Sequence, residues 1–384
     1  MPNNALKIGI LGFGAMGKAH AYAITNLPYF YSTLPFSASI AGVCASTPER
    51  TQARVAPFGL PAASSEDSLI NDPNIDIIDI CTPNRFHYAS IKKALAAGKH
   101  VLCEKPLGMT EQEGAELAEL AAKSGRVCRV VFNNRFIPAI MRAKQLIEEG
   151  RLGRILSFHA AYLHNSCLDP AKPAGWKQNA DICGGGVLYD LGSHVIDLII
   201  HLCGPVSAVS GMAQIGFTER TGMNGENWQT NADEAFYLMA ELACGAHGTM
   251  TLSKLSIGAN DDLTLDIRGT QGAIRFSLME PSFLEFYDAA SPDQPIGGLR
   301  GFTRIECVGR TPAPGGAFPS PKAPVGWLRG HIGSMYAFLD AVHRGDTQSG
   351  PTFAQGAEIN RIMAAAYRSA ECGQRIVLRE EDCL

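Results

Sequence analysis

A glycine-rich hexapeptide near the start of the sequence limits the possible folds more than any other segment. It reads Gly12-Phe13-Gly14-Ala15-Met16-Gly17. The hexapeptide directly follows an apolar run and opens a helical pattern, which is the context of a dinucleotide-binding turn. There the first glycine permits a tight turn, the second lets the backbone approach a pyrophosphate, and the third lets helix and strand pack closely. The pattern predicts that these six residues bind a dinucleotide; the alternative is a glycine turn without a ligand.

Up to about residue 132, short apolar runs alternate with longer helical patterns. The predicted strands are Lys7–Leu11, Ser39–Cys44, Ile75–Cys81, His100–Cys103 and Arg126–Phe132, and the helices between them start near Gly14, Pro48, Asn84 and Thr110. Such alternation is the signature of βαβ units, and continuous apolar strands are typical of a parallel sheet with helices on both faces. We therefore predict an α/β Rossmann domain over residues 1–132.

After Phe136 the pattern changes to runs in which polar and apolar residues alternate. A helix to about Gly150 precedes the strand RILSFHAAYLH and a helix from Gly184 to Leu202, and further strand-like runs are EAFYLMAEL, HGTMTLSKL, LTLDIRG and AIRFSL. This pattern predicts a mostly antiparallel open sheet with one helix-covered face. We expect an α+β domain over residues 133–384, with a long surface loop from about Ser291 to Gly326 and two closing helices after it.

The composition argues against several kinds of partner. The 33 Lys and Arg against 37 Asp and Glu give a net charge of −4, so no general positive field would attract a nucleic acid. The longest apolar runs end well before the roughly 20 residues of a membrane span, and the N-terminus lacks the features of a signal peptide. Eleven cysteines, an odd number far below that of disulfide-rich proteins, indicate a reducing compartment. We expect a cytoplasmic protein without nucleic-acid or membrane partners.

The segment after the second predicted strand bears on the choice between NAD and NADP. NAD sites normally offer Asp or Glu to the ribose 2′-hydroxyl at this point, but the sequence reads VCASTPER, with Ala45 and Ser46 in that place. Ser46 and Thr47 can donate hydrogen bonds and Arg50 can supply charge to a 2′-phosphate, which favours NADP. The alternative, compatible with the first, is a helix start with Thr47 as N-cap and Pro48 at the first helical position.

Four motifs occur in order along the chain: the hexapeptide, TPNRFH (Thr82 to His87), HVLCEKPLG (His100 to Gly108) and GGGVLYDLGSHVIDL (Gly184 to Leu198). In these motifs and their spacing the sequence resembles the Gfo/Idh/MocA oxidoreductases, named after glucose–fructose oxidoreductase, inositol dehydrogenase and a rhizopine catabolism protein. The resemblance implies a Rossmann domain followed by an α+β domain whose open sheet often forms a dimer or tetramer interface. It also implies NAD(P)-dependent oxidation or reduction of a sugar, inositol or related polyol carbon.

The resemblance also implies roles for individual residues. Asp190 and His194 match positions that contact substrate hydroxyls, and the histidine position gives or takes a proton beside the position of Lys105. The peptide bond before Pro106 is usually cis in the family. Pro83, Asn84 and His87, after the third strand, match positions that line the nicotinamide ribose; the alternative is a helix start led by Pro83. The predicted cofactor contacts after the third and fourth strands are Thr82, Pro83, Asn84, His87, Glu104 and Lys105.

Lys105 is a candidate on chemical grounds as well. Glu104-Lys105-Pro106 ends an apolar strand, and ligands bind at the carboxyl ends of parallel strands. Hydride transfer at a carbinol requires a proton to move on the same oxygen. A partly buried lysine with a lowered pKa, or one acting through a histidine, can hold and polarise that oxygen. The alternative is an exposed lysine at a strand end.

Four polar residues follow one another at helical spacing in DLGSHVIDLIIH. Asp190, His194, Asp197 and His201 lie at i, i+4, i+7 and i+11, so in a regular helix they form one polar stripe. The triple glycine before them lets a helix start close to a ligand, which favours catalytic roles for Asp190 and His194 over a solvated face with Asp190 as helix cap. A metal site is a rival use, but without a second His/Cys cluster at ligand spacing we predict no metal.

Three further residues are candidates: Arg135 for the nicotinamide wall, and Trp176 and Tyr162 for the substrate pocket. Trp176 could equally pack in the core, and strand alternation lets only some side chains beside Tyr162 face a pocket. We expect the loops at residues 165–180 and 312–326 to read the substrate's ring size and stereochemistry. A dinucleotide-binding sensor on the same scaffold is the alternative function, but a sensor needs no proton-transfer residues.

Overall fold

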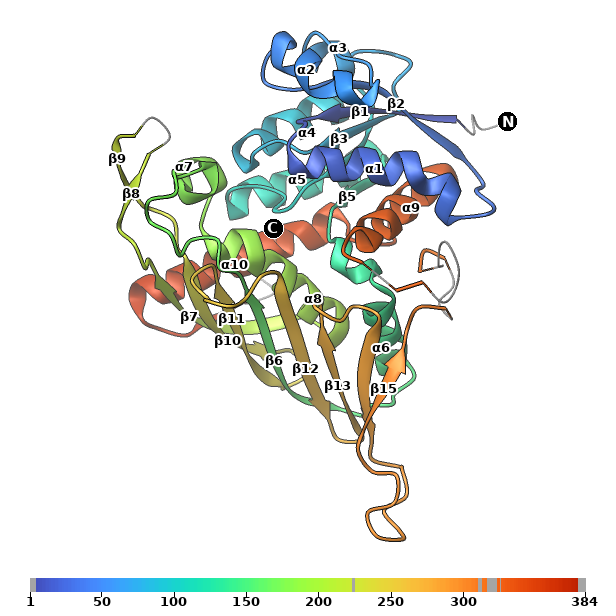
Figure 1. Ribbon diagram of the computed structural model, residues 1–384, viewed down its shortest axis with the longest axis vertical. Helices are drawn as coiled ribbons and strands as arrows, with labels where there is room; N and C mark the ends of the chain where they lie inside the picture. Colours follow the sequence, from blue (N-terminus) through green and yellow to red (C-terminus); the bar gives the residue numbers. More distant parts are fainter. Residues whose placement is uncertain (1–4, 223–224, 310–312, 316–322, 325, 379–384) are drawn as a thin grey trace. The chain divides into compact units, whose positions relative to one another are not determined.

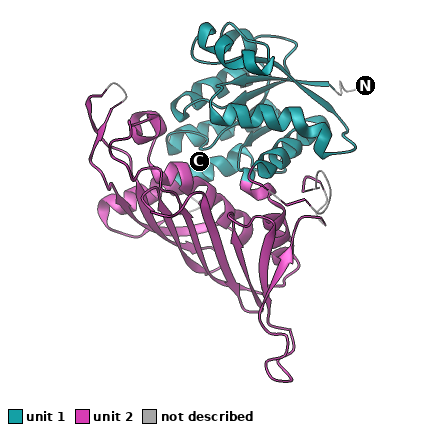
Figure 2. Ribbon diagram, in the orientation of Figure 1, with its two compact units in different colours: residues 1–133, 328–361 teal, residues 134–327, 362–384 magenta. Residues whose placement is uncertain are grey.

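A computed structural model describes all residues except 1–4, 223–224, 310–312, 316–322, 325 and 379–384. The chain divides into two compact units, which are coloured separately in Figure 2. Unit 1 comprises Met1–Asn133 and Leu328–Arg361, and unit 2 comprises Asn134–Trp327 and Ile362–Leu384. Each unit is built on a sheet of its own (Figure 1).

Unit 1 contains a five-stranded parallel sheet with the strand order β2-β1-β3-β4-β5. Its strands are β1 (Ala5–Leu11), β2 (Ser37–Cys44), β3 (Ile77–Ile80), β4 (His100–Cys103) and β5 (Cys128–Val130). The central strand β3 is buried along its whole length, as expected for a strand covered by helices on both faces. The predicted Rossmann fold is therefore confirmed.

Some helices of this part of unit 1 begin or end at recognisable local signals. They are α1 (Ala15–Phe30), α2 (Pro48–Val55), α3 (Glu66–Ile70), α4 (His87–Ala96) and α5 (Glu111–Ser124). Thr110 caps α5 by accepting the Glu113 N–H at 3.1 Å, and the helix ends at Gly125, whose φ of 64° suits glycine. The N-terminus of α1 has no side-chain cap, which leaves its first amides available to a ligand.

Helix α9 (Leu328–Arg344) belongs to unit 1 although it comes late in the sequence. Its buried face joins the core formed by β1 and α1 through Ile332, Met335, Phe338 and Leu339. Helix α10 (Phe353–Cys372) begins in the same unit, where Asn360 donates to the Gly108 carbonyl at 2.6 Å. The compact units therefore differ from the predicted division at residue 132, because residues 328–361 pack with the first sheet.

Unit 2 contains a nine-stranded mixed sheet with the order β15-β14-β13-β12-β6-β11-β10-β7-β16. Its strands are β6 (Ile155–Leu163), β7 (Val206–Gln214), β10 (Ala235–Leu242), β11 (His247–Ser253), β12 (Asp262–Gly269), β13 (Gly272–Ser277), β14 (Phe283–Asp288), β15 (Phe302–Glu306) and β16 (Ile376–Val377). The pair β6 and β11 is parallel, and the other neighbours described are antiparallel. The predicted mostly antiparallel sheet is confirmed. A separate small hairpin is formed by β8 (Glu219–Thr221) and β9 (Asn227–Gln229).

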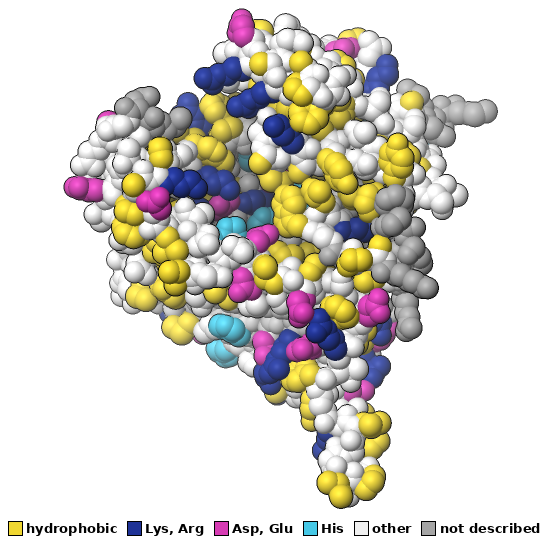
Figure 3. All heavy atoms as spheres, viewed as in Figure 1, with side chains coloured by type: hydrophobic (Ala, Val, Ile, Leu, Met, Phe, Trp, Pro, Cys, Tyr) yellow, Lys and Arg dark blue, Asp and Glu magenta, His cyan; other side chains and the backbone are white. Residues whose placement is uncertain are grey.

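The predicted surface loop from Ser291 to Gly326 is wrong in one part, because it contains the edge strand β15, which pairs with β14. Two arginine–aromatic contacts support this pairing. The Arg304 guanidinium lies 3.9 Å from the ring centroid of Phe283, and that of Arg275 lies 4.0 Å from the ring centroid of Phe302. The five residues of β15 were not predicted as a strand, because the surrounding sequence is rich in Pro and Gly. Hydrophobic side chains gather on the loop between β14 and β15, at the bottom of Figure 3, where Leu299 is 77% exposed.

The helices of unit 2 begin with α6 (Pro138–Glu148) and continue with α7 (Ala180–Cys183), a π-helical turn (Leu188–Gly192) and α8 (Ser193–Cys203). The helical run from Ala180 to Cys203 is long and apolar enough to cross a membrane by length and composition alone. Because 78% of its apolar window is buried inside the protein, it is weak evidence for a membrane span.

Candidate active site

The three glycines of the hexapeptide occupy three different backbone environments. Gly12 has a φ of +88°, and a Cβ there would lie 2.5 Å from the Cys81 carbonyl oxygen. A Cβ on Gly17 would lie 2.2 Å from the Gly12 carbonyl oxygen, so α1 packs directly on the turn. Gly14 faces open space, since nothing lies within 4 Å of a Cβ built there. This backbone fits a pyrophosphate at the N-terminus of α1.

The other three residues of the hexapeptide differ in what they offer to a ligand. The Phe13 side chain is 1% exposed and packs against Phe58 with ring centroids 5.7 Å apart. Ala15 is exposed and Met16 is half-buried. Phe13 can therefore contribute only its backbone to the predicted dinucleotide site.

The segment after β2 starts helix α2 and carries two arginines. The Thr47 hydroxyl accepts the Arg50 N–H at 3.2 Å, so the helix-start prediction for this segment is confirmed. The Arg50 guanidinium lies 3.5 Å from the Ser46 hydroxyl, and both residues are exposed. Arg54, one turn later, donates to the Phe13 carbonyl at 3.4 Å. The sequence pattern pointed to Arg50 and missed Arg54.

The residues that follow β3 fall into two groups. Thr82 and Pro83 are half-buried, whereas Asn84 is 7% and His87 is 0% exposed. The His87 ring nitrogens lie 2.9 Å from the Pro106 carbonyl oxygen and 3.0 Å from that of Thr82, and burial lowers the pKa of His87. The ring thus ties the segments after β3 and β4 together. The geometry does not support the predicted ribose contact, because the His87 side chain has no exposed surface.

Glu104, Lys105 and Pro106 follow β4 directly, and the Lys105–Pro106 peptide bond is cis. Glu104 is 6% exposed; its Oε1 lies 3.2 Å from His20 Nε2, and its Oε2 accepts the Lys105 N–H at 3.2 Å. Burial alone would raise the pKa of Glu104, but His20 and Lys105 lower it to about 2. The Glu104 carboxylate is engaged inside unit 1, so the geometry does not support the predicted direct contact with a cofactor. Lys105 itself is half-buried.

In unit 2, Asp190 is held by two lysines. Lys177 Nζ lies 2.8 Å and 2.9 Å from the two carboxylate oxygens, and Lys254 Nζ lies 3.0 Å from Oδ2. Lys177 is exposed, whereas Lys254 is 5% exposed. Burial alone would lower the pKa of Lys254, but the charge of Asp190 outweighs burial and the pKa is raised. Asp190 is therefore an ionised carboxylate fixed by a buried cation.

The π-helical turn that carries Asp190 is anchored by Asp233. The Asp233 carboxylate accepts the N–H of Gly186 at 2.7 Å and that of Leu188 at 3.0 Å. A Cβ on Gly186 would lie 1.9 Å from the Asp233 carbonyl oxygen, so the glycine permits this close approach. Asp233, and not Asp190, is the residue that caps this helical segment.

The predicted polar stripe is broken at its start, because Asp190 lies in the π-helical turn, whereas His194, Asp197 and His201 keep the spacing i, i+3 and i+7 within α8. Asp197 is 1% exposed, and its two carboxylate oxygens accept Arg135 Nε at 2.9 Å and 3.0 Å. Burial raises the pKa of Asp197 despite this guanidinium. Arg135 is thus the partner of a buried acid. Asp190 and His194 are partly buried, which argues against the alternative of a fully solvated face.

A second polar group of unit 2 surrounds Asp261. The Tyr162 hydroxyl donates to Asp261 Oδ1 at 2.7 Å, and His164 Nε2 lies 2.9 Å from the same oxygen. The rings of Tyr162 and His194 meet edge to face with centroids 6.2 Å apart. Burial and the charge of Asp261 raise the pKa of Tyr162, so its hydroxyl stays protonated. The structure therefore brings two predicted site residues, Tyr162 and His194, into contact.

Trp176 is 37% exposed, so the alternative of core packing is wrong. The Lys177 ammonium lies 5.7 Å from its ring centroid. Of the two loops expected to read the substrate, residues 165–180 are described, whereas most of residues 312–326 lie outside the described residues.

Comparison with known proteins agrees with this geometry. Residues 6–132 match the model of an oxidoreductase family with an NAD-binding Rossmann fold, and residues 140–275 match the GFO/IDH/MocA C-terminal domain. Levoglucosan dehydrogenase of Pseudarthrobacter phenanthrenivorans is 33% identical over 95% of this chain and 96% of its own length. D-glucoside 3-dehydrogenase of Escherichia coli is 27% identical over 98% and 99%. A solved levoglucosan dehydrogenase in complex with NADH and levoglucosan superimposes with a TM-score of 0.93 at 32% identity, over 98% of this chain and 100% of that one.

The dinucleotide-binding turn and the second domain together define an NAD(P)-dependent oxidoreductase. The chain belongs to the Gfo/Idh/MocA family, as its motifs had indicated.

Four charged residues of unit 2 escaped prediction from the sequence: Lys177, Lys254, Asp233 and Asp261. None of the four belongs to a motif that was recognised in the sequence. The signal that could have found Lys254 is a single charge inside the apolar strand run HGTMTLSKL, because a lysine at such a place needs a buried partner.

Proposed function

We propose that the protein transfers hydride between a nicotinamide cofactor and a carbinol carbon of a sugar, an inositol or a related polyol. The observation that carries the proposal is that Lys254 holds the carboxylate of Asp190 in a fixed position. In the same unit, Tyr162 contacts His194. Convergent polar groups of this kind recognise hydroxyls. The names of the relatives support the substrate class, since levoglucosan and a D-glucoside both carry ring hydroxyls.

In the proposed reaction, Lys105 holds and polarises the reacting oxygen. His194 accepts the proton of that oxygen during oxidation and returns it during reduction, while Asp190 accepts a hydrogen bond from a second hydroxyl and orients the ring. Tyr162 and Trp176 contribute to the substrate pocket. When bound, the nicotinamide ring gives or accepts the hydride. Acid–base help of this kind contributes roughly 10²–10⁴-fold to the rate.

We propose that the cofactor's pyrophosphate binds at residues 12–17 and that Thr82 and Pro83 line the nicotinamide ribose. For the adenosine ribose we propose a preference for NADP(H). The support is local: the exposed Arg50 lies beside Ser46, and Arg54 approaches the same glycine turn. Guanidinium groups bind phosphate strongly. A relative was solved with NADH. Tighter binding of NADH than of NADPH by this protein would contradict the proposed preference for NADP(H).

We further propose a homodimer or homotetramer formed through the sheet of unit 2. Three exposed apolar side chains support this: Met212, Tyr237 and Met239 are 62%, 40% and 61% exposed, and Met212 and Tyr237 are cross-strand partners. In function, residues 1–132 supply the dinucleotide site and residues 133–384 the substrate and oligomer contacts. The ten free cysteines among the described residues support a reducing cytoplasm.

Fluorescence titration with NADPH and NADH, followed by a panel of sugars and polyols with the tighter cofactor, tests the proposal. We expect turnover of at least one ring polyol or sugar, and a loss of about 10²–10⁴-fold in kcat for Lys105→Ala or His194→Ala with cofactor affinity retained. Full activity of both variants would contradict the assigned roles. Tight cofactor binding without turnover across the panel would instead favour a dinucleotide sensor.

A further inference from the structure

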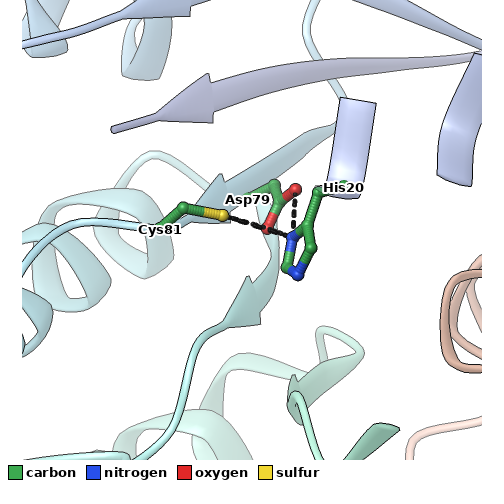
Figure 4. A group of neighbouring side chains, drawn as sticks. All are labelled: His20, Asp79 and Cys81. Carbon is green, nitrogen blue, oxygen red and sulfur yellow. Dashed lines mark hydrogen bonds and ion pairs between the residues drawn. The ribbon is translucent and has the colours of Figure 1, made fainter. Parts of the chain in front are cut away.

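A group of buried titratable side chains in unit 1 has no part in the reaction described so far. Its centre is His20 on α1, which is 1% exposed. His20 Nδ1 lies 3.0 Å and 2.9 Å from the two carboxylate oxygens of Asp79 and 3.2 Å from Cys81 Sγ (Figure 4). On the other side of the ring, Nε2 lies 3.2 Å from Oε1 of Glu104. The imidazole is therefore placed between two carboxylates from two different strands.

Both ring nitrogens of His20 face carboxylate oxygens. An ionised carboxylate only accepts hydrogen bonds, so Nδ1 donates to Asp79, whereas Nε2 forms an ion-pair contact with Glu104 Oε1 at 3.2 Å. Glu104 is ionised, because His20 and Lys105 lower its pKa to about 2. Burial alone would lower the pKa of His20, but Asp79 and Cys81 outweigh it and the pKa is raised well above its usual value. His20 is thus an imidazolium held by two buried anions.

A metal ion is the rival explanation for His20, Asp79 and Cys81, whose potential ligand atoms all lie within 4.8 Å of one another. The distances of 2.9–3.0 Å between nitrogen and oxygen are those of N–H···O hydrogen bonds. Without an ion, burial raises the pKa of Cys81 to about 12, so in this arrangement the sulfur is a thiol. The hydrogen-bonded arrangement accounts for these contacts without an ion.

Glu104 connects His20 to Lys105, the lysine on which the proposed function relies. Glu104 contacts His20 through one oxygen and the Lys105 backbone through the other. On the opposite side of the same segment, His87 lies 2.9 Å from the Pro106 carbonyl oxygen. The segment that carries Lys105 is therefore fixed through a side chain of α1 and one of α4.

We propose that His20, as a cation held between Asp79 and Glu104, is a positioning residue that fixes the backbone of Lys105 for hydride transfer. The inference rests on the proposed function. The titratable groups that face His20 are Asp79 and Cys81 from β3 and its end, Glu104 from the end of β4, and His331 from α9, whose ring centroid lies 5.9 Å away. Burial lowers the pKa of His331 to about 3, so His331 adds no competing charge.

The first test measures the charge state of His20 in the cofactor-free protein. In ¹⁵N spectra of histidine-labelled protein at about pH 8, where an ordinary histidine is neutral, we expect both nitrogens of one ring to stay protonated. That signal should be absent from His20→Gln. A neutral ring for His20, or a stoichiometric metal ion found by elemental analysis of the purified protein, would overturn the inference.

The second test measures kinetics in matched variants. His20→Gln should lower kcat by about 10²-fold, because a displacement of about 1 Å at a catalytic group costs that much, while the KM for substrate changes little. Lys99→Met is the control, since Lys99 is another buried cation of unit 1, which donates to the carbonyls of Asp72 and Ile75 at 2.6 Å and 2.7 Å. Its kcat should stay at the wild-type value.

The outcomes separate this inference from the proposed function. If Lys105→Ala is inactive and His20→Gln keeps its kcat, the positioning role is wrong and the proposed function stands. If Lys105→Ala is fully active, the proposed function fails, and the positioning role fails with it. Should His20→Gln not fold, Asp79→Asn removes one of the two anions and must also lower kcat, and the spectra of the unmodified protein still decide the charge state.

Discussion

The glycine turn of unit 1 is formed by backbone, whereas the charged group around Asp190 in unit 2 is formed by side chains. The turn consists of backbone from six consecutive residues, and its shape depends on the missing Cβ atoms of Gly12 and Gly17, whereas Gly14 leaves open space for a ligand. The group around Asp190 consists of side chains from separate elements, with an ionised acid between one buried and one exposed lysine. The first depends on volume and backbone conformation, and the second depends on charge balance.

This difference predicts which kind of substitution disrupts each region. In the turn, an added methyl group either blocks the ligand or clashes with the chain, and charge matters little. Around Asp190, a change of charge leaves a buried ion without a partner, which costs far more than a change of shape. Substitutions that keep volume but remove charge should therefore leave one region intact and disable the other.

The largest expected effect is that of Lys254→Met, which keeps the length of the side chain and removes the buried charge. We expect the free energy of unfolding to fall by up to about 3–5 kcal/mol, because the partly buried carboxylate of Asp190 loses its buried partner. Chemical denaturation of the variant and the wild type measures this difference.

The control for Lys254 is Lys177→Met, which removes the exposed lysine from the same carboxylate. An exposed ion pair contributes about 0–1 kcal/mol, so stability should barely change. In the double variant Asp190→Leu/Lys254→Met the stability should recover while activity stays lost. Equal destabilisation by the two single substitutions would contradict the importance of burial.

A smaller effect is expected for Gly14→Val. Its side chain would enter the open space above the turn, so cofactor affinity should fall by at least about tenfold, or 1.4 kcal/mol of binding free energy. The melting temperature should stay close to that of the wild type. Gly17→Ala is the comparison, because its Cβ meets backbone and should destabilise the fold itself. A Gly14 variant that binds the cofactor normally would show that the open space is not the pyrophosphate site.

The third effect concerns pH. Burial lowers the pKa of His100 to about 4, and its Nδ1 accepts the Val127 N–H at 3.0 Å, so the folded state holds the neutral ring. Between pH 6.5 and about 4 the unfolded chain binds the proton more readily, so stability falls as the pH falls through this window. The loss should reach at most about 2 kcal/mol at pH 5.

His100→Asn tests this assignment, since an amide oxygen can replace the accepting nitrogen and does not titrate. The variant should lose less stability than the wild type between neutral pH and pH 5. Parallel stability curves for the two proteins would show that His100 is not responsible.

The smallest effect is that of Thr47→Ala at the start of α2. Loss of a threonine cap costs about 1 kcal/mol, whereas Ser46→Ala, one residue earlier, removes no cap and should leave stability unchanged. Thermal unfolding of the two variants distinguishes them. If Ser46→Ala were the more damaging, the cap would be assigned to the wrong residue.

What could be predicted from the sequence follows the same distinction. The hexapeptide, the buried strand β3 and the cap at Thr47 are local, because neighbouring residues determine them, and the sequence predicted all three. The motif at Glu104 and His87 was found as well, but their side chains are engaged inside unit 1, and their partners could not be read from a motif.

The remaining features depend on contacts between distant segments. Lys254 meets Asp190 only after β11 and the π-helical turn have formed, and Asp233 caps that turn from another part of the chain. A π-helical turn has no local sequence signal, so the regular spacing of Asp190 and Asp197 was misleading. The edge strand β15 was missed because glycine and proline dominate the surrounding sequence.

The return of α9 to the first sheet has a consequence for biosynthesis. About 195 residues separate Asn133 from Leu328, and at about 5–20 residues per second a ribosome needs roughly 10–40 s to make them. During that time the nascent first sheet lacks the partners that Ile332 and Phe338 provide in its core. Synthesis of unit 1 therefore begins first, but its core is complete only after α9 has been made. Until then its exposed apolar surface is a natural target for chaperones.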